Sequence, residues 1–241
     1  YNAFMHVAQF WEGRAADVEE QAKGPILAAK EMGMPNEEAV VAKLKGMAAY
    51  PSLFERAFPA EEPSLTHDSL TYDNVGKAIG AFERNLTTPG RWDEYLGGDA
   101  DALSAEEVRG LQVFVETGCT TCHNGTLLGG TLYQKVGLVE PWPNQEDPGR
   151  FALTQNEADR MVFKVPSLRN IEKTGPYFHD SSALTLDEAV SKMARHQLGK
   201  PLDEKQRSAI VAFLSALTGD IPAAYIDPNR SDAGGSLHTQ H

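Results

Sequence analysis

The residues with the clearest chemical potential are the two cysteines of the chain and the histidine that follows them. They form the string Cys119-Thr120-Thr121-Cys122-His123, in which two residues separate the thiols. In this pattern both thiols can add to the vinyl groups of a porphyrin, and the adjacent imidazole can bind the iron as its proximal ligand. The spacing therefore predicts covalent attachment of haem c.

Two other uses of the motif stay open. A disulfide between closely spaced cysteines occurs in redox proteins of the thioredoxin type, which have a strand before the motif and a helix after it. A structural zinc site takes four ligands, and the two thiols alone cannot supply them. The thioredoxin interpretation gives His123 no role, whereas haem attachment uses all three residues and is the favoured interpretation.

A haem iron bound by His123 has either a second protein ligand, as in electron-transfer sites, or an open face for oxygen or peroxide chemistry. Met193 is the first candidate because it lies at the apolar edge of a predicted helix, where a thioether would raise the reduction potential. Methionines on such faces are, however, often ordinary core residues. His196 is the second candidate, followed by Met161 and His179. Taken alone, His179 is typical of a hydrogen-bonded surface histidine or one beside the haem propionates.

Composition indicates a globular chain and disfavours two kinds of partner. Hydrophobic residues make up 41% and charged residues 23% of the 241 positions, which is enough apolar material for a substantial core. The net charge of −12 repels phosphate backbones, so nucleic acid is not an expected partner. No apolar run approaches the ~20 residues that a membrane helix requires, so no membrane span is expected.

Helical periodicity recurs along the chain, and no strand pair is evident, so the predicted fold is all-α. Gly118 stands where a glycine would end the helix before the cysteines. Helices are expected over residues 17–32, from Asn36, from Asp73, after the capping boxes that begin at Ser104 and Thr185, and over 203–217.

Turn-forming residues mark the divisions of the chain. Thr87-Thr88-Pro89-Gly90 predicts a hinge or domain boundary. Residues 125–164 are rich in Gly and Pro, and a loop of that length in a compact domain is usually functional or wraps a cofactor. The expected division is therefore 1–88, 89–226 and a tail at 227–241.

Several further motifs occur in a fixed order. They are the string from Val7 to Ala15 around Trp11, Gln21 to Pro25, Lys30 to Met32, Cys119 to His123, Pro166 to Asn170, Pro176 to His179, and Met193 before Gln197-Leu198-Gly199. Their order over residues 1–224 resembles that of the bacterial di-haem cytochrome c peroxidases.

The resemblance implies two cytochrome c-like helical domains with long loops, each carrying a haem. The C-terminal domain would hold the high-potential haem, with His123 and Met193 as axial ligands. The N-terminal domain would hold the low-potential haem that reduces hydrogen peroxide. A small cytochrome c or copper protein would donate electrons through the His/Met haem. A homodimer and a periplasmic location are expected, the latter because haem c is normally attached outside the cytoplasm.

The resemblance also implies roles that the residues taken singly do not suggest. Trp11 alone is typical of a buried residue at a helix entry, and Glu31 of a solvated helix residue. In the family, the glutamate at the position of Glu31 is the acid–base catalyst, Gln21 lies on the same distal side, and Trp11 stands between the haems. Further expectations are haem contacts from Arg169 and His179, and an interdomain calcium ion bound by the backbone carbonyls of Thr174 and Pro176.

The sequence departs from the family in two respects. The first haem motif, the distal histidine and the calcium-binding asparagine would precede Tyr1, so an incomplete N-terminal domain and one haem attached by this chain are expected. The Arg195-His196 pair after Met193 is unusual and leaves the ligand open. Two alternative functions remain: a mono-haem electron-transfer cytochrome, and a di-haem relative that oxidises tryptophan on a partner protein. The relative has tyrosine at the position of Met193.

Overall fold

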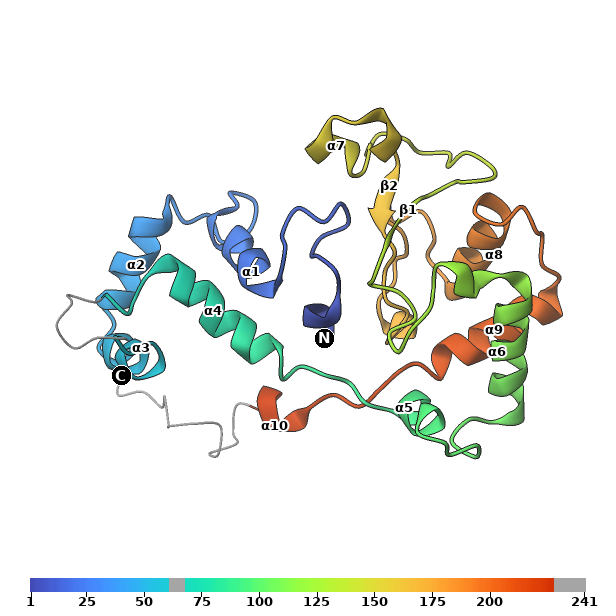
Figure 1. Ribbon diagram of the computed structural model, residues 1–241, viewed down its shortest axis with the longest axis horizontal. Helices are drawn as coiled ribbons and strands as arrows, with labels where there is room; N and C mark the ends of the chain where they lie inside the picture. Colours follow the sequence, from blue (N-terminus) through green and yellow to red (C-terminus); the bar gives the residue numbers. More distant parts are fainter. Residues whose placement is uncertain (61–67, 228–241) are drawn as a thin grey trace.

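The structure is a computed structural model that describes residues 1–60 and 68–227, and helices make up most of its regular structure (Figure 1). The all-α prediction is confirmed. Of the predicted tail at 227–241, all but Asp227 lies outside the described residues. The N-terminal part contains α1 (Val18–Leu27), α2 (Glu37–Lys45), α3 (Ala49–Ala57) and α4 (Tyr72–Glu83). The C-terminal part contains α5 (Arg91–Leu96), α6 (Ala105–Thr117), α7 (Phe151–Thr154), α8 (Leu186–His196), α9 (Glu204–Ser215) and α10 (Ala223–Ile226).

The helix ends follow local capping chemistry where the sequence shows it. Asn36 accepts a hydrogen bond from the N–H of Ala39 at 2.8 Å and begins α2. The predicted capping boxes at Ser104 and Thr185 begin α6 and α8. Gly118 ends α6 in the left-handed conformation, with φ 101°. These predictions are confirmed, because each depends only on residues adjacent to the helix end.

The prediction of a helix over 17–32 is wrong at its C-terminal end. α1 ends at Leu27. Beyond it, the N–H groups of Met32 and Met34 donate back to the carbonyls of Pro25 and Ile26 at 3.2 and 3.0 Å, which closes a turn. Glu31 therefore lies in an exposed turn instead of on a helix. The sequence does not predict α3, and α4 begins at Tyr72, one residue before the predicted Asp73.

The long segment at 125–164 contains a small sheet. β1 (Tyr133–Lys135) pairs antiparallel with β2 (Val162–Lys164), so that Tyr133 lies opposite Lys164. Strands of three residues are too short to show an alternating pattern in the sequence. This pairing brings the two ends of the stretch between residues 135 and 162 together.

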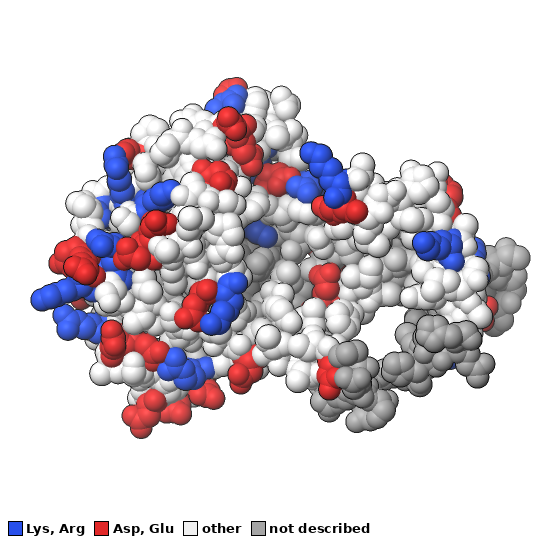
Figure 2. All heavy atoms as spheres, turned by 180° about the vertical axis from the view of Figure 1, so that it is seen from behind, with Lys and Arg blue, Asp and Glu red and all other residues white. Residues whose placement is uncertain are grey.

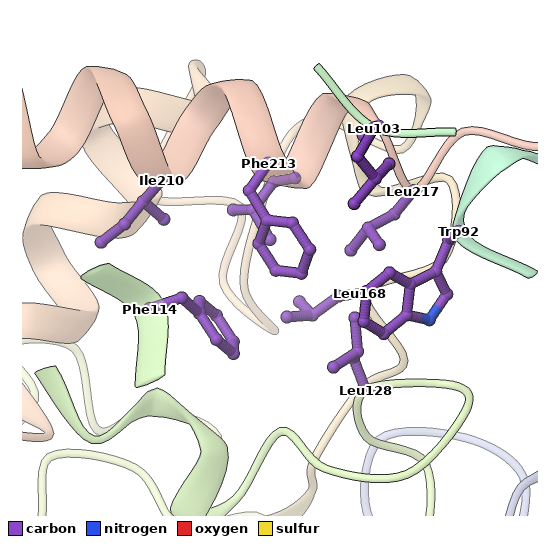
Figure 3. Packing of buried hydrophobic residues seen from close by; sticks show 10 residues of the cluster. Trp92, Leu103, Phe114, Leu128, Leu168, Ile210, Phe213 and Leu217 are labelled. Atoms are coloured by element: carbon purple, nitrogen blue, oxygen red, sulfur yellow. The ribbon is translucent and has the colours of Figure 1, made fainter. Parts of the chain in front are cut away.

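The buried apolar residues form two large clusters, one in each part of the chain. The N-terminal core consists of Ile26, Val40, Phe54, Leu70, Tyr72 and Val75. The C-terminal core is larger and is shown in Figure 3; its members include Trp92, Leu103, Phe114, Leu128, Leu168, Ile210, Phe213 and Leu217. Phe213 is fully buried and its ring packs against those of Trp92 and Phe114, with centroids 5.5 and 5.4 Å away.

The close crossing of α6 and α9 depends on Gly110. A Cβ atom at this position would lie 2.0 Å from the carbonyl oxygen of Ala209 and 2.8 Å from Cβ of Phe213. Both neighbours belong to the buried face of α9. The absence of a side chain therefore lets the backbones of the two helices touch, and α6 leads directly into the cysteine motif.

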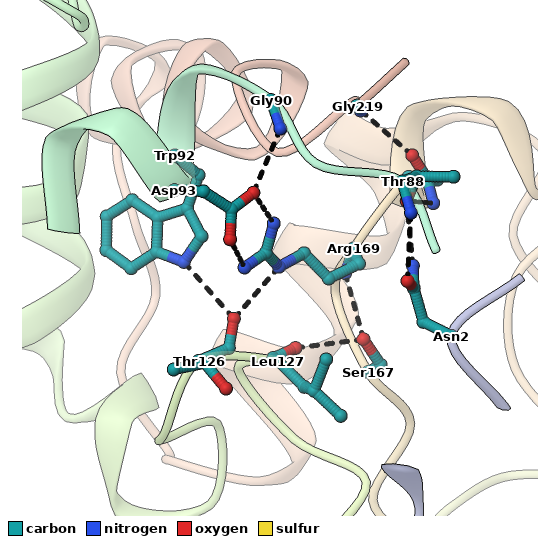
Figure 4. A network of polar contacts seen from close by, with 11 residues as sticks. Asn2, Thr88, Gly90, Trp92, Asp93, Thr126, Leu127, Ser167, Arg169 and Gly219 are labelled. Carbon is teal, nitrogen blue, oxygen red and sulfur yellow. Dashed lines mark hydrogen bonds and ion pairs between the residues drawn. The ribbon is translucent and has the colours of Figure 1, made fainter. Parts of the chain in front are cut away.

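The predicted hinge at Thr87–Gly90 is a buried junction. Thr88 is 3% exposed, and its hydroxyl oxygen accepts hydrogen bonds of 2.8 Å from the side-chain amides of Asn2 and Asn170 (Figure 4). The segment after α9 crosses here, because the N–H of Asp220 donates to the carbonyl of Pro89 at 2.8 Å. Three distant segments thus fix the linker, and the hinge interpretation is corrected.

On the face shown in Figure 2, the charged side chains do not form one large patch of a single sign. In Figure 2, acidic and basic side chains lie beside one another over much of that face, and the chain has 34 Asp and Glu against 22 Lys and Arg. None of the described helices combines the length and the apolar character needed to cross a bilayer.

Gly110→Ala is expected to lower the free energy of unfolding by about 1–3 kcal/mol, the usual range for overpacking a core. The added methyl group would overlap the Ala209 carbonyl. Urea unfolding measures the change. The comparison is Gly24→Ala in α1, where the new Cβ would meet nothing closer than a Phe10 ring atom at 3.8 Å outside the adjacent residues; this variant should cost less than Gly110→Ala. Equal effects at both sites would contradict the close-crossing argument.

Thr88→Val should cost about 1–3 kcal/mol, because it leaves the buried amide of Asn2 and the partly buried amide of Asn170 without their acceptor. Thr131→Val, at an exposed site, is the matched control. Limited proteolysis between α4 and α5 should become faster in the Thr88 variant. If the linker were an open hinge, both variants would be cut at the rate of the parent protein.

Candidate haem site

An apolar cavity of about 340 Å³ lies in the C-terminal part, beside the cysteine motif. Its walls come from the turn that carries the thiols, from α8, from residues 163–168 and 174–179, and from Trp11 of the N-terminal segment. Most of the residues expected to bind a cofactor or metal near the C-terminal haem line this one cavity: Cys119, Cys122, His123, Thr174, Pro176, His179 and Met193.

His123 is oriented by its backbone surroundings. Its Nδ1 lies 3.0 Å from the carbonyl oxygen of Leu128, and this bond requires the proton on Nδ1. Burial lowers the pKa of His123, which keeps the ring neutral. The lone pair of Nε2 is then available to a metal, and a carbonyl acceptor on the opposite nitrogen is the usual support of a metal-binding histidine.

The loop behind this histidine leaves no room for a side chain at Gly129. Its φ is +132°, and a Cβ atom would lie 2.1 Å from the Pro166 carbonyl oxygen and 3.3 Å from Nδ1 of His123. Leu128 is also left-handed, with φ 51°. The tight turn brings the Leu128 carbonyl to the imidazole.

The surroundings of the two thiols disfavour a thioredoxin-type site. The helix α6 precedes the motif where such a site has a strand. Both cysteines are free and half-buried, and burial raises the pKa of Cys119 to about 11, so this thiol forms little of the reactive thiolate. Within residues 1–60 and 68–227, no group of three or more His, Cys, Asp or Glu side chains could hold a metal ion. The free thiols in an apolar wall fit covalent haem attachment.

The candidates for the second axial ligand occupy different surroundings. Met193 lines the cavity from α8. His196 is 6% exposed, its Nδ1 lies 3.1 Å from the Glu140 carbonyl oxygen, and its ring packs on Trp142 with centroids 5.1 Å apart. Met161 is 4% exposed and belongs to the same buried cluster as Trp142. Neither His196 nor Met161 lines the cavity, so the geometry favours Met193 over both.

An aromatic wall closes one side of the cavity. The His179 ring stacks on Phe163, with centroids 4.2 Å apart and an interplanar angle of 21°. Trp11 meets both rings edge-on, with centroid distances of 6.4 Å, and is 40% exposed instead of buried. Nε2 of His179 is buried without a hydrogen-bond partner among the described residues. A ligand in the cavity that carries a hydrogen-bond donor or acceptor could pair with this Nε2 atom.

Arg169, which is expected to contact the haem, is not among the residues that line the cavity. Its guanidinium forms two hydrogen bonds of 2.6 Å to Asp93 and a third of 2.9 Å to the carbonyl of Thr126 (Figure 4). These bonds hold the pKa of Asp93 below its usual value. Arg169 therefore fixes Thr126, just before the turn that orients His123.

The expected peroxide-site residues lie in the N-terminal part and do not reach this cavity. Glu31 is exposed in the turn after α1, and Gln21 is partly buried on α1. Gln21 lies on α1 and Glu31 four residues beyond its end, and neither residue lines the cavity beside the cysteine motif.

The expected calcium-binding carbonyls lie in an exposed turn. Thr174 and Pro176 are both exposed, and among the described residues neither carbonyl oxygen accepts a hydrogen bond. Backbone carbonyls are suitable calcium ligands when water and further oxygens complete the shell. The turn offers two free carbonyls and no carboxylate cluster.

Among the residues of the cavity wall that sequence reasoning did not single out are Phe163 and Lys164. Both belong to β2, which is short and lies within the segment interpreted as a loop. The apolar string Met161-Val162-Phe163 is the one local signal that this part of the loop is buried.

Comparison with known proteins gives two family matches that follow one another along the chain. Residues 1–101 match the di-haem cytochrome c peroxidase family, and residues 107–218 match cytochrome c. The chain is 47% identical over 225 residues to the cytochrome c551 peroxidase of Nitrosomonas europaea. These matches assign residues 1–101 to the di-haem cytochrome c peroxidase family and residues 107–218 to the cytochrome c family. Haem c is therefore supported as its cofactor, and the resemblance seen in the sequence is confirmed.

Other family members extend the comparison. The cytochrome c551 peroxidase of Pseudomonas aeruginosa is 42% identical over 229 residues. Each of these two alignments covers 92% of this chain but 64% of the relative, so the chain spans a little less than two thirds of their length. A crystal structure of a MauG-like protein associated with microbial copper homeostasis superposes with a TM-score of 0.74 at 26% identity, covering 93% of this chain and 76% of that one.

Met193→Leu in the haem-loaded protein is expected to remove thioether ligation and lower the midpoint potential. The near-infrared charge-transfer band of thioether-bound haem should disappear. His196→Leu should leave that band unchanged, because His196 lies outside the cavity and is held by Glu140. Loss of the band in the His196 variant alone would transfer the ligand role to His196.

Proposed function

We propose that the protein containing this chain is a cytochrome c peroxidase that reduces hydrogen peroxide to water. Electrons from a small cytochrome c or copper protein would enter through a haem held by Cys119, Cys122, His123 and Met193. The observation that carries this proposal is the cavity in which two free thiols, a neutral oriented imidazole and a thioether share one apolar enclosure. The identity to peroxidases over most of the chain supports it.

The cavity residues suit an electron-storing site. Bound haem c supplies a one-electron redox centre. His123 donates from Nδ1 to Leu128, which increases the basicity of Nε2 as a ligand. Met193 would occupy the remaining axial position, and the apolar wall that includes Phe114, Leu168 and Ile210 excludes water. Such surroundings favour the reduced form and so a high potential.

Trp11 is suited to stand on the electron route between the two haems of the family. Its ring borders the cavity, and 40% of the residue is exposed. The backbone near it is fixed, since the Trp11 carbonyl accepts a 2.7 Å hydrogen bond from the N–H of Lys164. An indole held in this way offers a π-system between the cavity and the N-terminal part.

Proton transfer to and from peroxide is the proposed task of Glu31. Heterolytic O–O cleavage needs a group that takes one proton and returns it to the leaving oxygen, and a single carboxylate can do both. Glu31 lies in a turn where its carboxylate is open to solvent. Gln21, on the neighbouring α1, can orient peroxide through its amide without titrating.

Calcium is proposed to bind the carbonyl oxygens of Thr174 and Pro176. These carbonyls are exposed and lack hydrogen-bond donors among the described residues. The ion would fix the turn that leads to Tyr177 and His179, which both line the cavity. Water molecules would complete the oxygen shell.

The proposed organisation is a peroxide-reducing N-terminal domain ending near residue 88 and an electron-transfer domain over 89–226. The successive family matches at 1–101 and 107–218 support this division. The buried junction at Thr88 suggests that the two domains keep a fixed orientation. A periplasmic homodimer is proposed from the family resemblance and from the site of haem c attachment.

Glu31→Gln is expected to reduce peroxide turnover by at least about 100-fold, within the usual contribution of general acid–base catalysis. The haem absorption spectra should stay the same, since no axial ligand changes. Steady-state oxidation of a reduced cytochrome c by peroxide measures the loss. Glu55→Gln, an exposed position on α3, is the control and should retain activity. Near-parental turnover in the Glu31 variant would exclude this carboxylate from the mechanism.

A further inference from the structure

Lys164 is a buried cation in the cavity wall. It is 8% exposed and ends strand β2, beside the aromatic ring of Phe163. Its Nζ donates a 2.8 Å hydrogen bond to the carbonyl oxygen of Ala8, in the segment that leads to Trp11. Lysine is rarely buried to this extent without a paired charge, because removing an ammonium from water is costly.

No carboxylate among the described residues forms an ion pair with this ammonium. The acidic side chain that most influences it is Glu12, whose own partner is Arg14. Burial accordingly lowers the pKa of Lys164 to about 8, which leaves the group mostly protonated near neutral pH. The charge is therefore present but not balanced by this part of the chain.

The groups around Lys164 offer spare hydrogen-bond donors. Nδ1 of His6 lies 3.3 Å from Nζ, and burial lowers the pKa of His6 to about 4, so the ring is neutral and Nδ1 accepts from the ammonium. The ring proton is then on Nε2, which is buried and has no partner among the described residues. An ammonium has three N–H groups, of which Ala8 and His6 use two. One donor of Lys164 remains.

We propose that Lys164 binds a carboxylate of the group that fills the cavity, namely a propionate side chain of haem c. This inference rests on the proposed haem site. Lys164 and Trp11 both line the cavity, so a carboxylate there can reach the ammonium without crossing the chain. Charge-assisted hydrogen bonding would offset the cost of burying both ions.

The binding would also connect the cofactor to the N-terminal segment. Lys164 holds that segment at two points, through the Ala8 carbonyl and through its own N–H to the Trp11 carbonyl. An ammonium fixed by a propionate would therefore hold Ala8, and three residues later Trp11, against the cavity wall. Lys164 is thus assigned as a cofactor-binding residue that also positions Trp11.

The test replaces Lys164 by Met in the haem-loaded protein. Covalent attachment through the cysteines should persist, as measured by haem content after alkaline pyridine treatment. The midpoint potential of the C-terminal haem should fall by at least a tenfold change in the ferrous/ferric ratio, which is about 59 mV for one electron. The reason is that an unpaired propionate stabilises the ferric form. Resonance Raman spectra should show a shift of the propionate bending band.

Two further variants separate charge from packing. Lys164→Arg keeps the charge, so the midpoint potential of the haem should stay close to that of the parent protein. Lys205→Met makes the same change of charge at an exposed position of α9 and should change neither readout. If the Met variant does not accumulate, Lys164→Gln keeps a donor for the Ala8 carbonyl without the charge and carries the same expectation.

An unchanged potential together with an unchanged propionate band, in a Met or Gln variant that retains haem, would overturn the assignment. A merely structural role would lower stability but leave the band in place. Absence of haem from the parent protein is a different result, because it would refute the proposed haem site itself and with it the proposed function.

Discussion

The hydrogen bond between Nδ1 of His123 and the Leu128 carbonyl decides which ring nitrogen faces the cavity, and much of the C-terminal part serves to hold it. The accepting carbonyl belongs to a turn in which residue 129 has to be glycine, because a Cβ atom there would overlap the Pro166 carbonyl. Directly before this turn, Arg169 and the Trp92 indole both donate to the Thr126 carbonyl, at 2.9 and 3.3 Å. The donor follows α6, whose position depends on its close crossing with α9. The orientation of one imidazole therefore rests on contacts from three distant segments, which carry Trp92, Arg169 and α9.

The N-terminal segment around Val7 to Glu12 is hydrogen-bonded to the C-terminal part, although it directly precedes α1 of the N-terminal part. Val7 donates to the Gly130 carbonyl at 2.7 Å, Arg150 to that of Glu12 at 3.1 Å, and Lys164 to that of Trp11 at 2.7 Å. These bonds use main-chain carbonyls or N–H groups of the segment, so they constrain its path more than its side chains. An indole that must stand at a fixed distance from a cofactor needs a constraint of this kind. A boundary drawn from sequence alone at residue 88 does not convey this exchange.

The sequence predicts best what neighbouring residues determine. The haem motif, the capped starts of α6 and α8 and the glycine end at Gly118 are all encoded within a few positions. It predicts poorly what long-range contacts determine. Thr88 lies in a segment whose residue types predict a hinge. In the structure it is buried and bonded to Asn2 and Asn170, which are more than 80 residues away in the sequence. Arg169 lies in a cofactor motif yet pairs with Asp93, 76 residues before it. The buried position of Lys164 depends on backbone atoms of residues 8 and 11, more than 150 residues before it.

The two parts of the chain offer opposite surroundings, and the proposed chemistry needs both. Storing an electron favours a site whose structure and solvation hardly change between oxidation levels, and an apolar cavity lined from several segments meets that requirement. Cleaving peroxide consumes protons, which must come from water, and the exposed turn that carries Glu31 is open to it. A single site could not be both dry and proton-supplied. Separation of the two tasks then makes a fixed connection between them necessary, and the junction at Thr88 together with the anchored segment around Trp11 provides one.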